Sequence, residues 1–291
     1  MRNIREVIIN GVSLEEILDK HEKWLNGEED GEKADLNGVD LSYVDLSYVV
    51  LRGADLRGSN LKGAYLRRSD LRNSDLKDTN LKYAYLKDID LSYANLMGAN
   101  LSYTNLKDAN LKDTNLRDAD LRGANLRDAD LCGADLRLVD LSYADLSYAN
   151  LTNTNLGGSN LTNANLYNAD LKNINYNTST SFFALQCPEK GSFIGYKIAR
   201  EKIVELLITE DAKRSSATSR KCRCSKAKVL SITNVENTEE YNEVASVRDK
   251  SFVYRVGEIV EVKDFDENRW NECSAGIHFF MTRDEAVKYQ I

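Results

Sequence analysis

Hydrophobic positions recur every five residues through the middle of the chain. Leucine occupies every fifth position from Leu36 to Leu171, an unbroken run of 28 units. The residue two before each leucine is always Ala, Ser, Thr, Val or Ile, and the residue directly before it is Asp or Asn in nearly every unit. Such regularity over 34–177 predicts one repeated structural unit rather than an ordinary mixture of helices and strands.

A period of five fits neither an α-helix, with its period of 3.6, nor a plain strand, with its period of 2. The leucine and the small residue two before it lie on one face of an extended step. The next small residue comes three positions later, so the chain must bend once per unit to keep both positions inward. Repeated bends wind the chain into a coil with leucines on its axis and Asp or Asn outside. Such a coil buries its interior only when coils stack.

The unit A(D/N)Lxx resembles the pentapeptide-repeat family over residues 34–175. The resemblance implies an all-β solenoid, a right-handed quadrilateral β-helix with four units per coil and therefore about seven coils. Identical residue types recur at separations that are multiples of twenty, which supports this coil length. They include Tyr43, Tyr83, Tyr103 and Tyr143, and also Asp88, Asp108 and Asp128.

Both ends of the repeat carry sequences that suit caps. Residues 1–33 include an amphipathic segment, 13–26, that begins with the capping box Ser13 and Glu16 and predicts a helix. His21 lies on the apolar face of this helix, where we expect it to pack rather than to bind a ligand. At the other end we expect the distal plug of the coil to be formed by Phe182, Phe183 and Leu185.

Residues 178–291 have a different composition and predict a small α+β domain. Strand-like runs are SFIGYKIA, KIVELLI, KAKVLSI, SFVYRV, EIVEV and GIHFF, and Thr282–Glu285 forms a second capping box before a final helix. A mostly antiparallel sheet is the simplest arrangement. This segment resembles an uncharacterised module that follows pentapeptide repeats in bacterial, phage and large-virus proteins, which implies a fold-level grouping and no known activity.

Charge and composition exclude several broad classes. The net charge of −7 is mildly acidic, which disfavours a general nucleic-acid binder because phosphate contacts need clustered Lys and Arg. No apolar run approaches the length of a membrane span, and the first residues, MRNIREVIING, lack the apolar core of a signal peptide. Five cysteines without an export signal predict reduced thiols, and we expect a cytoplasmic protein.

The C-terminal segment holds the candidate chemistry. Cys222, Cys224, Cys273 and His278 suggest a zinc site, but C-x-C is poor metal spacing and buried thiols are the favoured interpretation. Cys273 and His278 could instead serve as nucleophile and base, although no orienting third group is visible. A transferase-like site around Ser215, Ser216 and Ser219 is a further alternative with an incomplete signature. We expect no cofactor and no metal.

A basic stretch between the strand-like runs offers another surface. Its cations could bind phosphate or RNA. No aromatic residue lies between them, however, so a solvated loop is favoured over a nucleic-acid-binding surface. The candidate residues are Lys213, Arg214, Arg220, Lys221 and Arg223.

The repeats themselves offer partner surfaces. On the coil model, columns form from Lys87, Asp88, Lys107, Asp108, Arg127 and Asp128 on one face, and from Tyr83 and Tyr103 on another. The resemblance also implies a possible function as a DNA mimic, because the quinolone-resistance group of this family binds DNA gyrase by imitating duplex DNA. Residues 34–173 contain 19 Asp against 16 Lys and Arg, which is too balanced for a duplex mimic.

These observations favour a non-catalytic rigid scaffold over an enzyme. We expect the repeats to present surfaces to an unidentified protein partner, with the C-terminal domain as an appended recognition domain. An enzyme or ligand-binding role of the C-terminal domain is the alternative, and gyrase binding is disfavoured. The sequence leaves the oligomeric state open.

Overall fold

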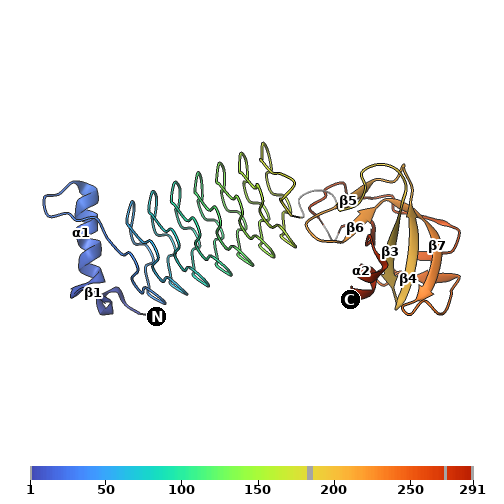
Figure 1. The fold of residues 1–291 in the computed structure, drawn as a ribbon, viewed down its shortest axis with the longest axis horizontal. Helices are drawn as coiled ribbons and strands as arrows, with labels where there is room; N and C mark the ends of the chain where they lie inside the picture. Colours follow the sequence, from blue (N-terminus) through green and yellow to red (C-terminus); the bar gives the residue numbers. More distant parts are fainter. Residues whose placement is uncertain (1, 182–185, 272–273, 290–291) are drawn as a thin grey trace. The chain divides into compact units, whose positions relative to one another are not determined.

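The chain forms two compact units in a computed structural model that describes residues 2–181, 186–271 and 274–289 (Figure 1). The first unit is Met1–Ser181 and the second is Phe182–Ile291. Each unit has its own network of backbone hydrogen bonds. The predicted distal plug, Phe182, Phe183 and Leu185, lies outside the described residues, and so does Cys273.

A short capping segment precedes the repeats, as the amphipathic pattern predicted. It comprises a 3₁₀ turn η1 (Ile4–Glu6), strands β1 (Ile8–Ile9) and β2 (Val12–Ser13), and helix α1 (Leu14–Asn26). The Ser13 side chain accepts a hydrogen bond from the backbone N–H of Glu16, and Gly27 ends the helix in the left-handed conformation. His21 is fully buried, and its Nδ1 accepts from the N–H of Ala34 at 3.1 Å. The histidine therefore packs, as its position predicted.

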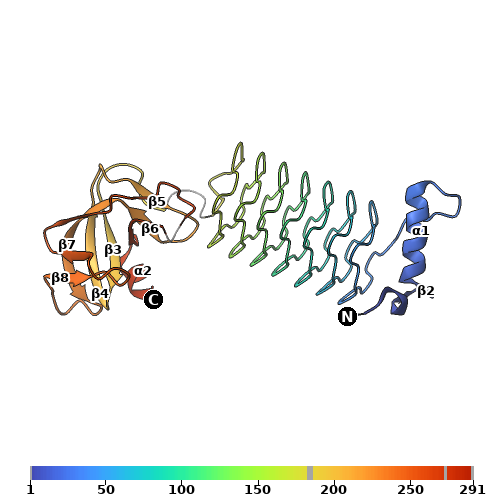
Figure 2. The ribbon, with the colours of Figure 1, turned by 180° about the vertical axis from the view of Figure 1, so that it is seen from behind.

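The repeats wind into a coil of twenty residues per turn (Figures 1 and 2). Parallel bridges join each Asp or Asn position to the one twenty residues later, from Asp35 and Asp55 through Asn155 and Asn175. Each bridge has two backbone hydrogen bonds, such as Leu36 N–H to Asp55 O at 2.7 Å and Asp55 N–H to Ala34 O at 3.1 Å. The leucines fill the interior with almost no exposed surface. Four pentapeptide units therefore make one coil of a β-helix.

The polar residue before each leucine has a structural role that its outward placement did not reveal. Its side-chain oxygen accepts the N–H two residues later, as Asp40 Oδ1 does from Ser42 at 3.1 Å. Many also bond between coils, as Asn60 Nδ2 does to Asp40 Oδ1 at 2.9 Å. The second residue after the leucine adopts a left-handed conformation, with φ near 60° at Tyr83, for example. This residue produces the bend that the five-residue period required.

The second unit contains antiparallel sheets, as predicted. The largest has the order β10-β7-β4-β3, built from β3 (Phe193–Ala199), β4 (Lys202–Ile208), β7 (Lys226–Asn234) and β10 (Ile259–Glu261). A second has the order β11-β6-β5, built from β5 (Arg214–Ser216), β6 (Cys222–Cys224) and β11 (Ile277–Phe279). Strands β8 (Glu243–Ala245) and β9 (Val253–Arg255) pair separately, and helix α2 (Arg283–Lys288) begins at a complete capping box.

The core of this unit lies between its sheets. Residues from β4, β6, β7 and β11 share one hydrophobic cluster that includes Leu206, Cys224, Val229 and Phe279. The hydrogen bonds between Tyr196 on β3 and Phe280 beyond β11 connect the two sheets. None of the described helices has the length and apolar character that crossing a bilayer demands.

Candidate functional site

One face of the β-helix carries a column of exposed tyrosines. Tyr83 and Tyr103 stack with ring centroids 5.6 Å apart, and 49% and 55% of their surfaces are exposed. Lys82 Nζ lies 5.1 Å from the Tyr83 ring and 5.8 Å from the Tyr103 ring, within the range of cation–π attraction. We call the in-register set the tyrosine column, which comprises Tyr43, Tyr83, Tyr103 and Tyr143.

Glycines make room for two rings of the tyrosine column. Gly123 follows Tyr103 by twenty residues, and a Cβ at Gly123 would lie 2.7 Å from Cε1 of that ring. The same relation holds for Gly63 and Tyr43, at 2.6 Å. Both glycines have positive φ, which suits the bend as well. The rings of Tyr43 and Tyr103 therefore occupy space over the next coil that a Cβ at these positions would fill.

A second face carries the predicted charges, which pair with one another. We call Lys87, Asp88, Lys107, Asp108, Arg127 and Asp128 the charge ladder. Lys107 Nζ lies 3.2 Å from Asp108 Oδ2 and 3.6 Å from Asp128 Oδ2, so it joins two coils. Lys87 reaches Asp108 at 3.8 Å. The hydrogen bond to Asp108 raises the pKa of Lys107.

The ladder ends on residues outside the predicted set. Arg67 and Arg68 lie 3.6 Å and 3.4 Å from Asp88, and the Arg127 guanidinium lies 5.0 Å from the Tyr148 ring. Each carboxylate of the ladder thus has at least one cation within 4 Å. This face is balanced internally, which leaves little unpaired charge for a partner.

The candidate zinc ligands that the structure describes do not converge. On β6 and β11, Cys224 pairs with Ile277 and Cys222 with Phe279, whereas His278 pairs with Arg223. Successive side chains alternate between the faces of a sheet, so both cysteines lie on one face and His278 on the other. Among the described residues, no group of three potential ligands could hold a metal ion. Cys273, the fourth candidate ligand and the candidate nucleophile, lies outside the described residues.

The cysteines belong to the core. Cys222 and Cys224 are fully buried, and the Cys224 thiol donates to the carbonyl of Ile277 at 3.8 Å. Burial raises the pKa of Cys224 to about 12. Cys187, which the sequence did not connect with this pair, hydrogen-bonds with Cys222, an interaction that lowers the pKa of Cys187 and raises that of Cys222. Thiols with raised pKa values are poor nucleophiles.

The basic stretch is not the solvated loop that its composition suggested. It forms β5 and β6, and Arg223 within it is only 2% exposed. The Arg223 guanidinium donates to the carbonyls of Asp266, Asn268 and Ala275 at 2.9–3.1 Å. Arg214 likewise donates to backbone carbonyls, including that of Gly191 at 2.8 Å. Buried carbonyls of distant segments need hydrogen-bond donors, and one arginine supplies several. This need explains why these two arginines do not lie in a solvated loop.

Two more cations of this stretch form ion pairs at the surface. Lys213 pairs with Glu267, and Arg220 Nη1 lies 2.7 Å from Glu285 Oε1 at the start of α2. Lys221 has no ion pair among the described residues and lines a cavity instead. The five predicted cations therefore divide into three kinds and do not form one phosphate-binding surface.

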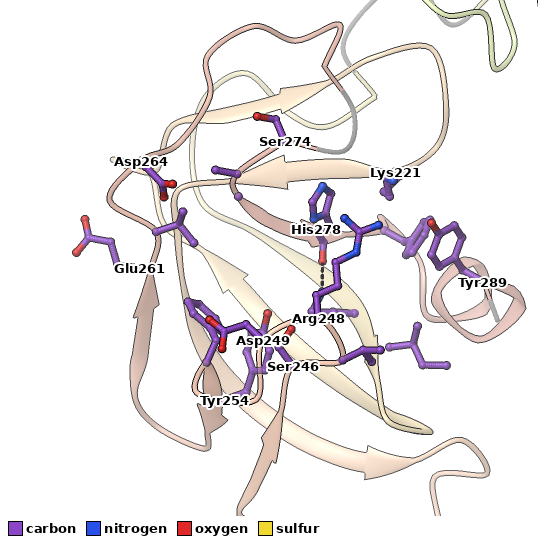
Figure 3. Close-up of a pocket in the computed structure, with 18 of the residues that line it drawn as sticks. Lys221, Ser246, Arg248, Asp249, Tyr254, Glu261, Asp264, Ser274, His278 and Tyr289 are labelled. Carbon is purple, nitrogen blue, oxygen red and sulfur yellow. Dashed lines mark hydrogen bonds between the residues drawn. The ribbon is translucent and has the colours of Figure 1, made fainter. Parts of the chain in front are cut away.

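The C-terminal unit contains a cavity of about 480 Å³ (Figure 3). Lys197, Lys221, Arg248 and His278 line it together with Tyr254. Lys197 Nζ donates to the carbonyl oxygen of His278 at 3.3 Å. Burial, with a smaller contribution from Arg248, lowers the pKa of Lys197 to about 8. Burial also raises the pKa of Tyr254.

Sequence reasoning found two of these residues, Lys221 and His278, and missed Lys197 and Arg248. The sequence feature that could have indicated Lys197 is its position as the one lysine of the apolar run FIGYKIA, between Tyr196 and Ile198. Nothing in the sequence around Arg248 indicated that it would face the same cavity.

Comparisons with known proteins agree with this architecture. Residues 34–175 match pentapeptide repeats (8 copies), and residues 183–286 match a family of unknown function, DUF5758. No curated protein matches the chain.

Several solved structures are similar to the repeats. HetL, a pentapeptide repeat protein involved in heterocyst differentiation regulation from the cyanobacterium Nostoc sp. strain PCC 7120, is 35% identical. The match covers 48% of this chain and 73% of HetL, with a TM-score of 0.34. QnrB1, a plasmid-mediated fluoroquinolone resistance protein, is 19% identical over 50% of this chain and 90% of that chain, with a TM-score of 0.28. The chain belongs to the pentapeptide-repeat family, and a domain that matches DUF5758 follows its repeats.

Proposed function

We propose that the repeats are a non-catalytic scaffold that binds a protein partner through the tyrosine column. The observation that carries this proposal is the exposed, stacked pair Tyr83 and Tyr103, held in register by the backbone ladder. Tyrosine is enriched at protein interfaces because it offers a large contact area and a polar hydroxyl at little entropic cost. Rings already held by stacking lose still less freedom on binding.

The charge ladder is the weaker of the two faces as a partner surface. Lys107 would have to release Asp108 and Asp128 before it could bind an acidic partner. Exposed ion pairs contribute little each, so such an exchange gains little. We infer that the ladder mainly joins neighbouring coils.

DNA mimicry, and with it gyrase binding, is not supported by the charge distribution. Duplex DNA carries about one charge per 1.7 Å, and each is exposed. Many of the outward carboxylates here are paired with cations, as Asp88, Asp108 and Asp128 show. We expect a gyrase supercoiling assay to be unaffected by the protein.

The finer geometry of the coil is part of the proposal. We propose a right-handed, four-sided β-helix of about seven coils, which the family implies and the twenty-residue period supports. The zinc interpretation loses support, since Cys222 and Cys224 lie on the opposite face of their sheet from His278. The enzyme alternative with Cys273 as nucleophile stays a prediction, because Cys273 lies outside the described residues.

Substitutions at the tyrosine column test the proposal. The double variant Tyr83→Asn, Tyr103→Asn removes both rings but keeps a residue type that the same column already accepts at Asn163, with φ of 56°. The matched control is Tyr93→Asn, because Tyr93 is 61% exposed in a different column that also contains Asn73.

The measurement is quantitative affinity capture with the full chain and both variants as bait. We expect proteins captured by the wild type and the Tyr93→Asn variant to be lost with the double variant. If the double variant retains every specifically captured protein, the tyrosine column is not the partner surface.

A further inference from the structure

The cavity of the C-terminal unit has two chemically different ends. In Figure 3, Lys221, Arg248 and His278 lie together on one side, and Glu261 and Asp264 lie on the opposite side. Lys197 lines the same cavity and donates to the carbonyl of His278, which places it at the basic end. The cavity is therefore polarised, with positive charge at one end and carboxylates at the other.

Three cations of the basic end, Lys197, Lys221 and Arg248, differ from neighbouring arginines in their ion pairs. Within residues 2–181, 186–271 and 274–289, no ion pair includes Lys197, Lys221 or Arg248. By contrast, Arg220 pairs with Glu285 and Arg255 pairs with Glu243. Like charges gathered without a counter-ion repel one another, so a bound anion would stabilise this arrangement.

The nearest acidic residue in sequence is already engaged elsewhere. Asp249 follows Arg248 directly, but its Oδ1 accepts hydrogen bonds from the N–H and Oγ of Ser251 at 2.8 and 2.6 Å. These bonds lower the pKa of Asp249, which keeps it ionised and turned toward its own loop. Asp249 also lines the cavity, but within the described residues it forms no ion pair with Arg248.

We propose that this cavity binds a small organic phosphate, with the phosphate between Lys197, Lys221 and Arg248. Three cations match the charge of a phosphate monoester, about −1.5 to −2 at pH 7, better than that of a single carboxylate. The volume of about 480 Å³ falls within the range of small-ligand sites.

The remaining lining suits the body of such a ligand. Phe252, Val262 and Ala275 add apolar surface to the lining. Glu261 and Asp264 can accept hydrogen bonds from hydroxyl or amino groups of the ligand. The ligand class is therefore a phosphorylated molecule with an apolar or planar body and polar donors at its other end. This proposal concerns only the C-terminal unit and is independent of the tyrosine column.

Calorimetric titration of the full chain tests the proposal, with adenosine monophosphate as probe and adenosine and citrate as comparisons. We expect the monophosphate to bind more tightly than either comparison. Equal binding of adenosine would show that the phosphate is not recognised, and tighter binding of citrate would show a carboxylate site. Either result, or no binding of the monophosphate, overturns the proposal.

A pair of variants in one loop locates the site. Arg248→Gln removes a cation that lines the cavity, and Lys250→Gln removes one two residues away that does not line it. Arg248 and Lys250 are both exposed, so neither variant should disturb folding. We expect Arg248→Gln to weaken binding about tenfold, because it removes a charge-assisted hydrogen bond, and Lys250→Gln to leave it within about twofold. Equal losses would indicate general charge attraction and reject the site.

Chemical labelling supplies a measurement at Lys197 itself. An amine-reactive reagent at pH 8, followed by peptide mass spectrometry, reports the labelling rate of each lysine. We expect adenosine monophosphate to protect Lys197 and Lys221 but not Lys250, and adenosine to protect none. Unchanged labelling of Lys197 at saturating monophosphate would place the ligand elsewhere.

Discussion

The repeat unit and the C-terminal unit hold their backbones together over different distances along the chain. In the repeats every bridge joins residues twenty apart until the last, which joins Asn160 to Ser181. In the C-terminal unit the partners vary, from Ala199 and Lys202 in one hairpin to Tyr196 and Phe280 across the domain. The free energy of unfolding of the repeats is thus a sum of similar contributions from each coil. In the C-terminal unit, by contrast, we expect a few side chains to make large individual contributions.

The largest expected effect is at Arg223, a single group that several segments share. Arg223→Leu leaves the carbonyls of Asp266, Asn268 and Ala275 without their charged donor. We expect the free energy of unfolding of the C-terminal unit to fall by about 3–5 kcal/mol. Urea unfolding followed by the fluorescence of Trp270 measures it.

Arg220→Gln is the matched control. It removes a cation three residues earlier in the same stretch, whose side chain is 66% exposed and pairs with Glu285. We expect a loss below about 1 kcal/mol. Similar losses for the two variants would show that burial does not distinguish these arginines.

The next effect tests whether the repeats are equivalent. Leu111 and Leu131 occupy the same position one coil apart, and both are fully buried. Leu→Ala at either should lower the free energy of unfolding of the repeats by about 3 kcal/mol, since each leaves a similar cavity. Circular dichroism during denaturation measures both. A difference well above about 0.5 kcal/mol would contradict the picture of equal terms.

A smaller effect concerns the pH dependence of the stability of the C-terminal unit. Between pH 8 and about 10.5 the unfolded chain binds a proton at Lys197 that the folded chain has released, so stability rises with pH there. We expect Lys197→Met to stabilise the C-terminal unit at pH 7 by about 1–2 kcal/mol, with the advantage shrinking by pH 9.5. Unfolding titrations at pH 7, 8.5 and 9.5 check this. A destabilised variant at pH 7 would mean that the Lys197 charge is satisfied.

The smallest effect concerns the acid limit of the repeats. Hydrogen bonds from Arg122 and Arg137 lower the pKa values of Asp120 and Asp135. Their contribution is therefore present above about pH 4 and is lost as the pH falls further. We expect Arg122→Gln to cost less than about 1 kcal/mol at pH 7 and progressively less as the pH falls below about 4. A difference that persists at low pH would point to packing by the arginine stem instead.

The sequence predicted the repeats well because every determinant there is local. The leucine, the small residue and the bend lie within five residues, and the coil repeats them. It also predicted α1 and α2, whose capping residues Ser13 and Thr282 precede them directly. It did not predict the role of Asp and Asn as acceptors for the bend, since a polar residue on a surface needs no such role.

The C-terminal site could be predicted only in part. Lys221 and His278 were candidates, but as members of a basic loop and a metal site. Lys197 lies on β3 and Arg248 in the loop between β8 and β9, yet both line the same cavity. The spacing of these two residues in the sequence does not indicate that they line one cavity.

The sequence by itself therefore determined the β-helix, its period and the columns on its surface, because each contact there recurs at a fixed separation. The tertiary structure alone decided that Arg223 is buried, that Cys222 and Cys224 face away from His278, and that three cations share a cavity. Those outcomes depend on single pairings between distant strands, for which the chain contains no repeated signal.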